Sequence, residues 1–435
     1  MSTRIVLFTA LAALASPALL PAQEGRLAFI IPNLYGPAGL IVDSEARLPD
    51  GSTHSAHFNS AFQAEFTQFN VSLASQLASV PLPSPASGFT YELDTTLGVF
   101  KRSTQSFGPI LADRAETIGN KKTSFGLNYQ SFHFDTLEGI DLAHVPAVFT
   151  HDGAAPGGRA DVVTTDNSID LRVSQLISYL SYGLTDRVDI SVALPVVNVD
   201  LGVVSNATLR RIGTAASPAT HFFRDAAGGF STQKTFASSR SASGIGDLIA
   251  RVKIQPFKGG ASGFALGVEG RFPTGDEQNL LGSGAYGVKP FVVLSVSKKL
   301  LSPHLNAGYQ WNGDSVLAGN VLTGEKKSLP DQILYAAGVD IGVSSRVTLA
   351  LDVIGRRVLK SPRIETENFR ALDGTSTFPG THFTQDANFN VTNGSAGVKI
   401  NAAGKLLFDL NVLFKMDEGG LRDRITPLFG FEYSF

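Results

Sequence analysis

The chain has 435 residues and a formal net charge of −2, with 36 Lys and Arg against 38 Asp and Glu. Charged residues make up only 17%, below the roughly 25% of a typical soluble domain, and glycine is abundant at 44 residues. Nucleic-acid-binding proteins usually carry a basic surface, so this charge balance gives no support for a nucleic-acid partner. The absence of cysteine excludes disulfides, thiolate metal sites, a thiol nucleophile and a lipid-anchored cysteine.

The N-terminus has the three-part pattern of a secretory signal peptide. Arg4 supplies a positive charge, residues 5–15 form an apolar run, and the small residues Ala18 and Ala22 precede a polar stretch. We therefore predict a signal peptide over residues 1–22. The apolar run is too short for the alternative, a membrane-anchoring helix, and no run of 18 apolar residues follows it.

Residues 23–122 lack the rhythm of the rest of the chain. Within them, residues 58–80 carry apolar side chains at a spacing of three or four, which predicts an amphipathic helix that ends at the following prolines. Residues 91–99 alternate as a further strand would. We expect an N-terminal, partly helical plug inside or below a barrel; a periplasmic appendage or partner-binding domain is the alternative.

From Ser124 onward, apolar and polar residues alternate in segments of about ten residues. Successive side chains of a strand point to opposite faces, so each segment has one apolar face, such as Val188, Ile190 and Val192, and one polar face. The predicted strands lie at 123–134, 168–182, 187–199, 247–257, 262–272, 287–299, 303–313, 331–343, 346–358, 391–402, 404–415 and 424–435.

The connections alternate between short turns and long loops, and the long ones lie at 135–167, 200–246, 273–286, 314–330, 359–390 and 416–423. Bacterial outer-membrane barrels have this arrangement, with short periplasmic turns and long extracellular loops. The sequence therefore predicts an all-β fold, a transmembrane antiparallel up-and-down β-barrel of 12 strands over residues 123–435. If residues 91–99 span the membrane with a returning partner, the barrel has 14 strands.

A soluble β-sandwich or β-solenoid is the competing interpretation. Two features favour the membrane barrel over it. Large apolar side chains occupy nearly every position of one face, too many for a water-exposed surface, and the polar face carries charges of both signs, which a dry core does not accept unpaired. In a bilayer every backbone polar group needs an internal partner, so strands cross it only as a closed barrel.

The last strand ends in an alternating aromatic series that closes with Phe435. Such an ending is typical of the signal that the outer-membrane assembly machinery reads. We therefore expect this machinery and the lipid bilayer as partners, and a location in the bacterial outer membrane.

The polar strand faces are expected to line the barrel lumen. Charges of both signs favour salt-bridge ladders that stiffen the wall, because a selective pore shows one dominant sign. The candidate lumen-lining residues are Arg251, Lys253, Glu269, Arg271, Asp340, Asp352, Arg356, Lys399, Asp409, Lys415 and Glu432.

No motif for catalysis or metal binding stands out. The eight histidines are scattered, and His54 and His57 lack an acidic partner at helical spacing. His133 with Ser131 resembles the rim residues of some outer-membrane hydrolases, but no positioned set of nucleophile, base and orienting residue accompanies them. We predict no enzymatic activity, no metal and no cofactor.

A literal G-x-G-x-x-G occurs at 282–287. A dinucleotide-binding loop needs a buried parallel strand before it and a helix that opens on its last glycine. Here an alternating strand precedes the glycines, and Pro290 with a β-rich run follows them. We predict a compact extracellular turn in which glycines supply unusual backbone angles and in which Asp276 and Glu277 anchor contacts.

Two stretches, SGIGDLIARVK at 243–253 and ALGVEGRFPTGDEQNLLGSGAYGVKPFVVLS at 265–295, resemble a known family of outer-membrane transporters. It is the family described as "putative MetA-pathway of phenol degradation", related to FadL-type transporters of hydrophobic compounds. The motif residues are Gly246, Asp247, Pro273, Gly275, Asp276, Gly282 and Gly284.

The resemblance implies that small hydrophobic or aromatic compounds pass the outer membrane by passive diffusion, without cofactor or energy source. Two alternatives stay open from the residues alone. One is a general porin for hydrophilic solutes, and the other is a structural or adhesive barrel that uses its long extracellular loops.

Overall fold

The computed structural model describes residues 25–36, 39–47, 51, 56–58, 91–94, 99–102, 106–151, 161–225, 227–259, 261–298 and 300–435. Within these ranges, the helical elements are two 3-10 turns, η2 (Leu27–Phe29) and η4 (Glu277–Asn279). No helix of this part of the chain is long and apolar enough to cross a membrane. The predicted signal peptide, and the predicted helix apart from Phe58, lie outside the described residues.

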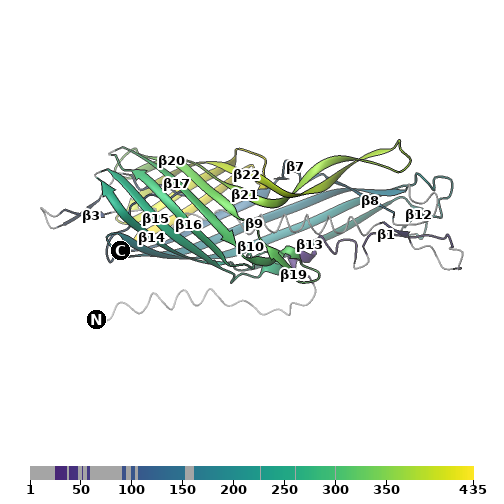
Figure 1. The fold of residues 1–435 in the computed structure, drawn as a ribbon, viewed down its shortest axis with the longest axis horizontal. Helices are drawn as coiled ribbons and strands as arrows, with labels where there is room; N and C mark the ends of the chain where they lie inside the picture. The colour runs from purple at the N-terminus through teal and green to yellow at the C-terminus, as the bar shows by residue number, and fades with distance from the viewer. Residues whose placement is uncertain are drawn as a thin grey trace.

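Twelve antiparallel strands close into a barrel, and the ring closes where β25 pairs with β5 and β5 with β9 (Figure 1). All of the predicted strands are present. They are β5 (Thr123–Phe134), β9 (Val162–Thr185), β10 (Val188–Arg210), β14 (Leu248–Gly259), β15 (Ser262–Phe272), β16 (Gly287–Val296), β17 (Leu301–Asn312), β20 (Gln332–Gly342), β21 (Val347–Arg370), β22 (Thr377–Ala403), β23 (Leu406–Lys415) and β25 (Ile425–Ser434).

The 14-stranded alternative is wrong. The segment that suggested it forms β3 (Tyr91–Asp94), which pairs with β4 (Val99–Arg102) in a separate two-stranded sheet. This hairpin lies at the end of the barrel that carries the C-terminus (Figure 1). A strand of four residues covers too little distance to cross a bilayer, which takes about nine to eleven.

Within the barrel, apolar side chains point outward and polar ones inward. On β10, Ile190, Val192 and Val196 are exposed on the outside, whereas Asp189 and Ser191 are buried inside. The same alternation recurs on β15, β21 and β23. The outer surface is therefore one that contacts lipid, as the sequence pattern predicts.

Several strands continue far beyond the membrane-facing barrel and form an extension on the long-loop side (Figure 1). The predicted loop at 200–246 is largely wrong, because β10 runs on to Arg210 and β13 (Gln233–Ile245) pairs with it. The predicted loop at 359–390 is wrong as well, since β21 and β22 remain paired as far as Arg370 and Thr377. β8 (Val145–Thr150) adds to the outer part of β9.

The polarity of the two strand faces reverses where the extension begins. The outward Val196 and Leu176 face each other across β10 and β9, and the next outward pair is Asn198 with Ser174. The outer surface changes between these two pairs from apolar to polar. Beyond this point the buried, inward face of β10 is apolar except for Ser205 and comprises Val199, Leu201, Val203, Ala207 and Leu209.

The largest apolar cluster of the described residues fills the extension, and the N-terminal segment supplies its centre. Residues Leu27, Ile30, Ile31, Leu34, Leu40 and Val42 pack against the inward faces of the extended strands. The ring of Tyr35 makes edge contacts with Phe149 and Phe236, and its hydroxyl lies 2.9 Å from Ser205 Oγ. Burial raises the pKa of Tyr35 to about 12.

Short strands occupy the remaining predicted loops. β1 (Ile41–Val42) pairs with β2 (Ala56–His57), and β6 (Thr136–Leu137) lies between β7 (Ile140–Asp141) and β24 (Leu421–Arg422). Two further hairpins are β11 (Phe223–Arg224) with β12 (Phe230–Ser231) and β18 (Asp314–Asn320) with β19 (Glu325–Ser328).

The reversal of polarity predicts opposite tolerances for a charge on the outer face. Leu266→Arg places a cation in the middle of the lipid-facing part of β15 and should lower the free energy of unfolding by about 2–4 kcal/mol. Val204→Arg places the same charge on the outside of the extension and should change it by less than about 0.5 kcal/mol. Urea unfolding of both variants in lipid vesicles measures the difference, and equal losses would contradict the assigned boundary.

Candidate functional site

A segment that precedes the first barrel strand lies along the inner wall of the barrel. We call residues 106–119 the inner belt. Its backbone amides bond to side chains of successive wall strands: Phe107 N donates to Thr348 Oγ1 at 2.9 Å, Asp113 N to Asn306 Oδ1 at 2.7 Å, Ala115 N to Ser295 Oγ at 3.0 Å and Ile118 N to Asp189 Oδ2 at 3.0 Å. The belt therefore runs around the wall from β21 to β10.

Glycines in the wall make room for the belt. A Cβ atom added at Gly183 would meet the Gly119 carbonyl oxygen at 1.9 Å. One added at Gly263 would meet Ala115 Cβ at 2.9 Å. At Gly397 it would meet Ile110 Cδ1 at 2.5 Å. At these three positions, on β9, β15 and β22, there is no space for a side chain larger than that of glycine between the belt and the wall.

Charged wall residues bind the belt as well. Arg251 Nη1 lies 2.8 Å from Asp113 Oδ2, and Lys253 Nζ donates to the carbonyl oxygens of Arg114 and Glu116 at 3.1 and 2.8 Å. The Glu116 carboxylate accepts hydrogen bonds from Ser295 and Ser297. The belt thus provides hydrogen-bond partners for buried polar groups of the wall, which water would otherwise have to satisfy.

A salt-bridge ladder crosses three neighbouring strands of the inner wall. Arg251 on β14 faces Glu269 on β15, which faces Lys289 on β16. Both oxygens of Glu269 are used, with Arg251 Nη2 and Lys289 Nζ each 2.5 Å away. Arg251 and Glu269 are among the lumen-lining residues predicted from the sequence. Lys289 is not, although its place in the alternation of β16 puts it on the same face.

The other expected lumen residues also have buried or half-buried side chains, in separate groups. Asp352 Oδ1 lies 2.7 Å from His304 Nε2, and Asp340 Oδ2 lies 3.7 Å from His304 Nδ1. Lys415 Nζ pairs with Glu418 at 2.7 Å. Lys399, Asp409 and Glu432 are buried on β22, β23 and β25, and Arg271 and Arg356 on β15 and β21 line a cavity inside the barrel.

Sequence reasoning missed His304, whose ring lies between two of these carboxylates. Its signal was available, because Ser302, His304 and Asn306 alternate with outward residues on β17. The register adds what the sequence lacked: His304 is opposite Gly338, and Gly338 is opposite Asp352. The three positions therefore lie side by side on one face of the sheet.

The barrel interior contains a cavity of about 230 Å³ beside the belt. Charged side chains of six residues line part of it: Asp113, Arg251, Glu269, Arg271, Lys289 and Arg356. Uncharged polar side chains such as Asn306, Gln310 and Gln332 line it as well, together with apolar ones, among them Leu111, Ile249, Phe291, Ile354 and Val391. The Arg251 guanidinium lies 5.1 Å from the centre of the Phe291 ring, so charged and apolar groups are in contact within the lining.

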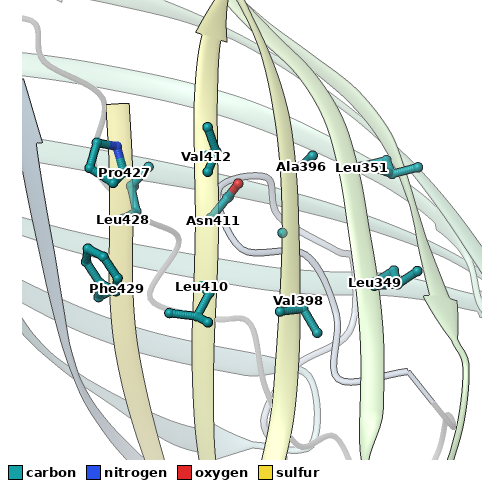
Figure 2. A pocket seen from close by; sticks show the side chains of 11 residues that line it. Leu349, Leu351, Ala396, Val398, Leu410, Asn411, Val412, Pro427, Leu428 and Phe429 are labelled. Atoms are coloured by element: carbon teal, nitrogen blue, oxygen red, sulfur yellow. The ribbon is translucent and has the colours of Figure 1, made fainter. Parts of the chain in front are cut away.

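A second depression, of about 430 Å³, lies on the lipid-facing surface (Figure 2). Figure 2 shows the side chains around it, which come from β21, β22, β23 and β25 and include Leu349, Leu351, Val398, Leu410, Val412, Pro427 and Phe429. Ala396 contributes to the depression because its outward side chain is small. Strand pairing beneath it is continuous, from Ala350 to Gly397 to Asn411, so the described wall has no gap there.

The family-motif residues Gly246 and Asp247 form a β-bulge where β13 passes into β14. β10 pairs with Ile245 through Val196 and with Ile249 through Ala193, so residues 246–248 face residues 194–195. One extra residue on one strand bends it and turns side chains into new directions. Here the bulge marks the point at which the strand leaves the membrane-facing barrel.

The Asp247 side chain ties the glycine-rich loop to this bulge. Gly275 N donates to Oδ1 at 3.1 Å and Ser283 N to Oδ2 at 2.8 Å. A Cβ atom at Gly282 would lie 2.3 Å from Asp247 Oδ1 and 2.8 Å from Gly275 Cα. Pro273 begins the loop directly after β15, and no helix follows the glycines, which lead into β16.

Two other positions of the motif shape the same loop. Asp276 accepts hydrogen bonds from the Gln278 and Asn279 amides and so caps η4. Gly284 has a φ of +67°, a conformation that side chains rarely adopt. The neighbouring Glu277 accepts a hydrogen bond from Ser315 Oγ at 3.1 Å, which connects the loop to β18.

The residues that the sequence offered as candidates for catalysis or metal binding do not form a common site. His133 Nε2 lies 3.2 Å from Asp170 on the outer surface, and Ser131 is on the same strand face. His57 lies in β2, and His54 is outside the described residues. Among the residues that the structure describes, no group of three His, Asp or Glu side chains is placed to bind a metal.

The C-terminal Phe435 lies at the seam of the barrel. Its amide donates to Thr123 O at 2.9 Å, and its carbonyl accepts from Thr123 N at 3.0 Å. The aromatic side chain is half exposed on the outer surface beside Tyr433.

The motif residues lie within a stretch of the chain that matches a known protein family. Residues 151–327 match the family described as "Putative MetA-pathway of phenol degradation". This match contains the bulge at Gly246 and Asp247 and the whole glycine-rich loop. It confirms the resemblance that these residues indicate. A search of curated protein sequences finds no significant match.

Several solved structures are similar to this chain at low sequence identity. An outer membrane channel from Pseudomonas putida F1 is 13% identical, with a TM-score of 0.42, and the alignment covers 74% of this chain and 99% of that one. A FadL homologue from Pseudomonas aeruginosa is 12% identical, with a TM-score of 0.31 and coverages of 73% and 90%. The NanC porin is 8% identical, with a TM-score of 0.35 and coverages of 71% and 98%.

The close contact at Gly282 predicts that this glycine is required for the loop. Gly282→Ala should push the loop away from Asp247 and make residues 273–286 several-fold more susceptible to proteinase K. Gly202→Ala is the matched control, because its added Cβ would meet no atom closer than 3.7 Å. Equal cleavage rates for the two variants would contradict the role given to Asp247.

Proposed function

We propose that this protein is an outer-membrane channel that passes small hydrophobic or aromatic compounds by passive diffusion. The observation that carries the proposal is the cavity inside the closed barrel, whose lining combines apolar side chains with charged and uncharged polar ones. Such a site accepts an apolar body while a few polar groups orient it. A predicted signal peptide over residues 1–22 and the C-terminal Phe435 support export and assembly into the outer membrane.

The inner belt favours a narrow pathway over a wide aqueous pore. It contacts the wall from β22 through β9 and occupies part of the lumen of a twelve-stranded barrel. We propose that residues 23–122 act as one N-terminal unit with two positions. Its first part, within residues 27–42, packs in the extension, and its last part, the inner belt, restricts the barrel.

Uptake by cells tests this function. In a porin-deficient host, production of the protein should raise the uptake of a labelled single-ring aromatic hydrocarbon several-fold and leave the uptake of labelled arabinose unchanged. Ala336→Phe fills the cavity and should abolish the gain, whereas Ala237→Phe, exposed on β13, should retain it. Heat-dependent migration in SDS gels verifies that each variant is folded.

The rival functions predict other results. A general porin would raise arabinose uptake as much as aromatic uptake. A structural or adhesive barrel, for which the polar outer surface of the extension is the supporting observation, would raise neither. Either result contradicts the proposed function.

A further inference from the structure

We propose that the depression on the lipid-facing surface and the two cations below it form a binding site for one anionic phospholipid of the periplasmic leaflet. An acyl chain of the lipid lies in the depression, and its phosphate lies between the side chains of Arg346 and Lys405. The site is on the outer wall of the barrel. It goes beyond the proposed function and does not depend on which compounds pass the lumen.

The depression is a groove that follows β22. On the outer face of this strand, Ala396 is opposite Leu351 of β21 and opposite Val412 of β23. Val398 is the next outward residue toward the short turn. Longer side chains of β21 and β23 form the two sides of the groove, and β22 forms its floor (Figure 2). An acyl chain in this groove has apolar atoms on three sides and gains dispersion contacts with all of them.

The groove lies in the half of the hydrocarbon core that is nearest the short turns. Leu349 and Leu351 of its lining come three and five residues after Arg346, which ends the turn before β21. These separations correspond to about 10 and 17 Å along a strand, and the tilt of a barrel strand by roughly 45° reduces the depth further. Half of the hydrocarbon core is about 15 Å thick. Since short turns face the periplasm, the groove belongs to the periplasmic leaflet.

Arg346 and Lys405 flank the end of β22 at which the groove begins. The amide of Asn401 on β22 donates to the Arg346 carbonyl oxygen at 2.8 Å, and Lys405 ends the turn that follows β22. Both cations are exposed, and neither forms an ion pair with a carboxylate of the described residues. Tyr433 is opposite Leu406, directly after Lys405, and is exposed on the outer surface. Aromatic side chains in such positions mark the level of the headgroups.

The charge of the whole short-turn rim favours an anionic lipid over a zwitterionic one. Each of the five short turns contains or adjoins a cation, and Asp186 is the one carboxylate within these turns. Asp186 already accepts a hydrogen bond from Asn120 N at 3.1 Å. A Lys or Arg near an anionic membrane surface contributes about 1 kcal/mol to binding. The cations of the five turns are Arg187, Lys258, Lys298, Lys299, Arg346 and Lys405.

Native mass spectrometry of the purified, folded protein in detergent tests the inference. The probes are phosphatidylglycerol and phosphatidylethanolamine with identical acyl chains, offered in equal amounts. The protein should retain one phosphatidylglycerol at least about tenfold more often than one phosphatidylethanolamine, because only the former has a net negative charge for the two cations.

One pair of variants tests the cations. Arg346→Gln combined with Lys405→Gln should lower phosphatidylglycerol retention to the level of phosphatidylethanolamine. Arg187→Gln combined with Lys298→Gln is the matched control, since it removes the same charge from exposed positions of the same rim. The control should change retention by less than about twofold.

A second pair of variants tests the groove. Ala396→Phe fills it and should lower the retention of both lipids several-fold. Ala250→Phe, opposite the outward Val192 on another part of the wall, should leave both unchanged. Heat-dependent migration in SDS gels verifies that every variant is folded.

Four results would overturn the inference. Equal retention of the two lipids by the unaltered protein would remove the charge preference, and this comparison needs no variant. Equal losses in the two charge variants would assign binding to the whole rim. Undiminished retention by folded Ala396→Phe would remove the acyl chain from the groove. A dimer that Ala396→Phe dissociates would show that a second copy of the chain occupies the groove.

Discussion

The structure depends on one constraint: a closed sheet in lipid must present apolar side chains outward, which leaves its polar side chains inside and in need of partners. The ladder of Arg251, Glu269 and Lys289 satisfies some of them within the wall. The inner belt satisfies others through its backbone, for example the amide of Ala115 at Ser295. The polar wall and the belt therefore stabilise each other, and the cavity is the space that they leave.

The same constraint explains why the polarity of the two strand faces is reversed in the extension. Once the strands leave the bilayer, their outer face meets water, so Asn198 follows Val196 on the outside of β10. The inner face is then apolar and needs an apolar filling, which the segment around Ile30 and Leu34 provides. The family motif lies at this transition, where the bulge at Asp247 redirects the strand and binds the glycine-rich loop.

Much of the barrel was predictable because its signals are local. Period-two alternation and short turns identify the twelve strands, and the polar faces identify the buried charges. The extension was missed because its alternation, as in Val199 to Leu209, continues with reversed polarity inside a segment taken for a loop. An N-terminal segment inside or below the barrel was expected, but the path of the inner belt along the wall could not be predicted. Ala115 and its neighbours have no periodic pattern, and their partners are spread over many strands. The hydrogen bond between Asp247 and Gly275 could not be predicted either, because it depends on the strand register.

The most direct test of this account is a disulfide cross-link between the belt and the wall. The chain contains no cysteine, so the pair Ala115→Cys and Ser295→Cys can be introduced without competing thiols. Mild oxidation of outer membranes should join this pair nearly completely, whereas Ala115→Cys with Ser205→Cys, a position in the extension, should stay reduced. A folded protein in which the first pair remains unlinked would contradict the placement of the inner belt.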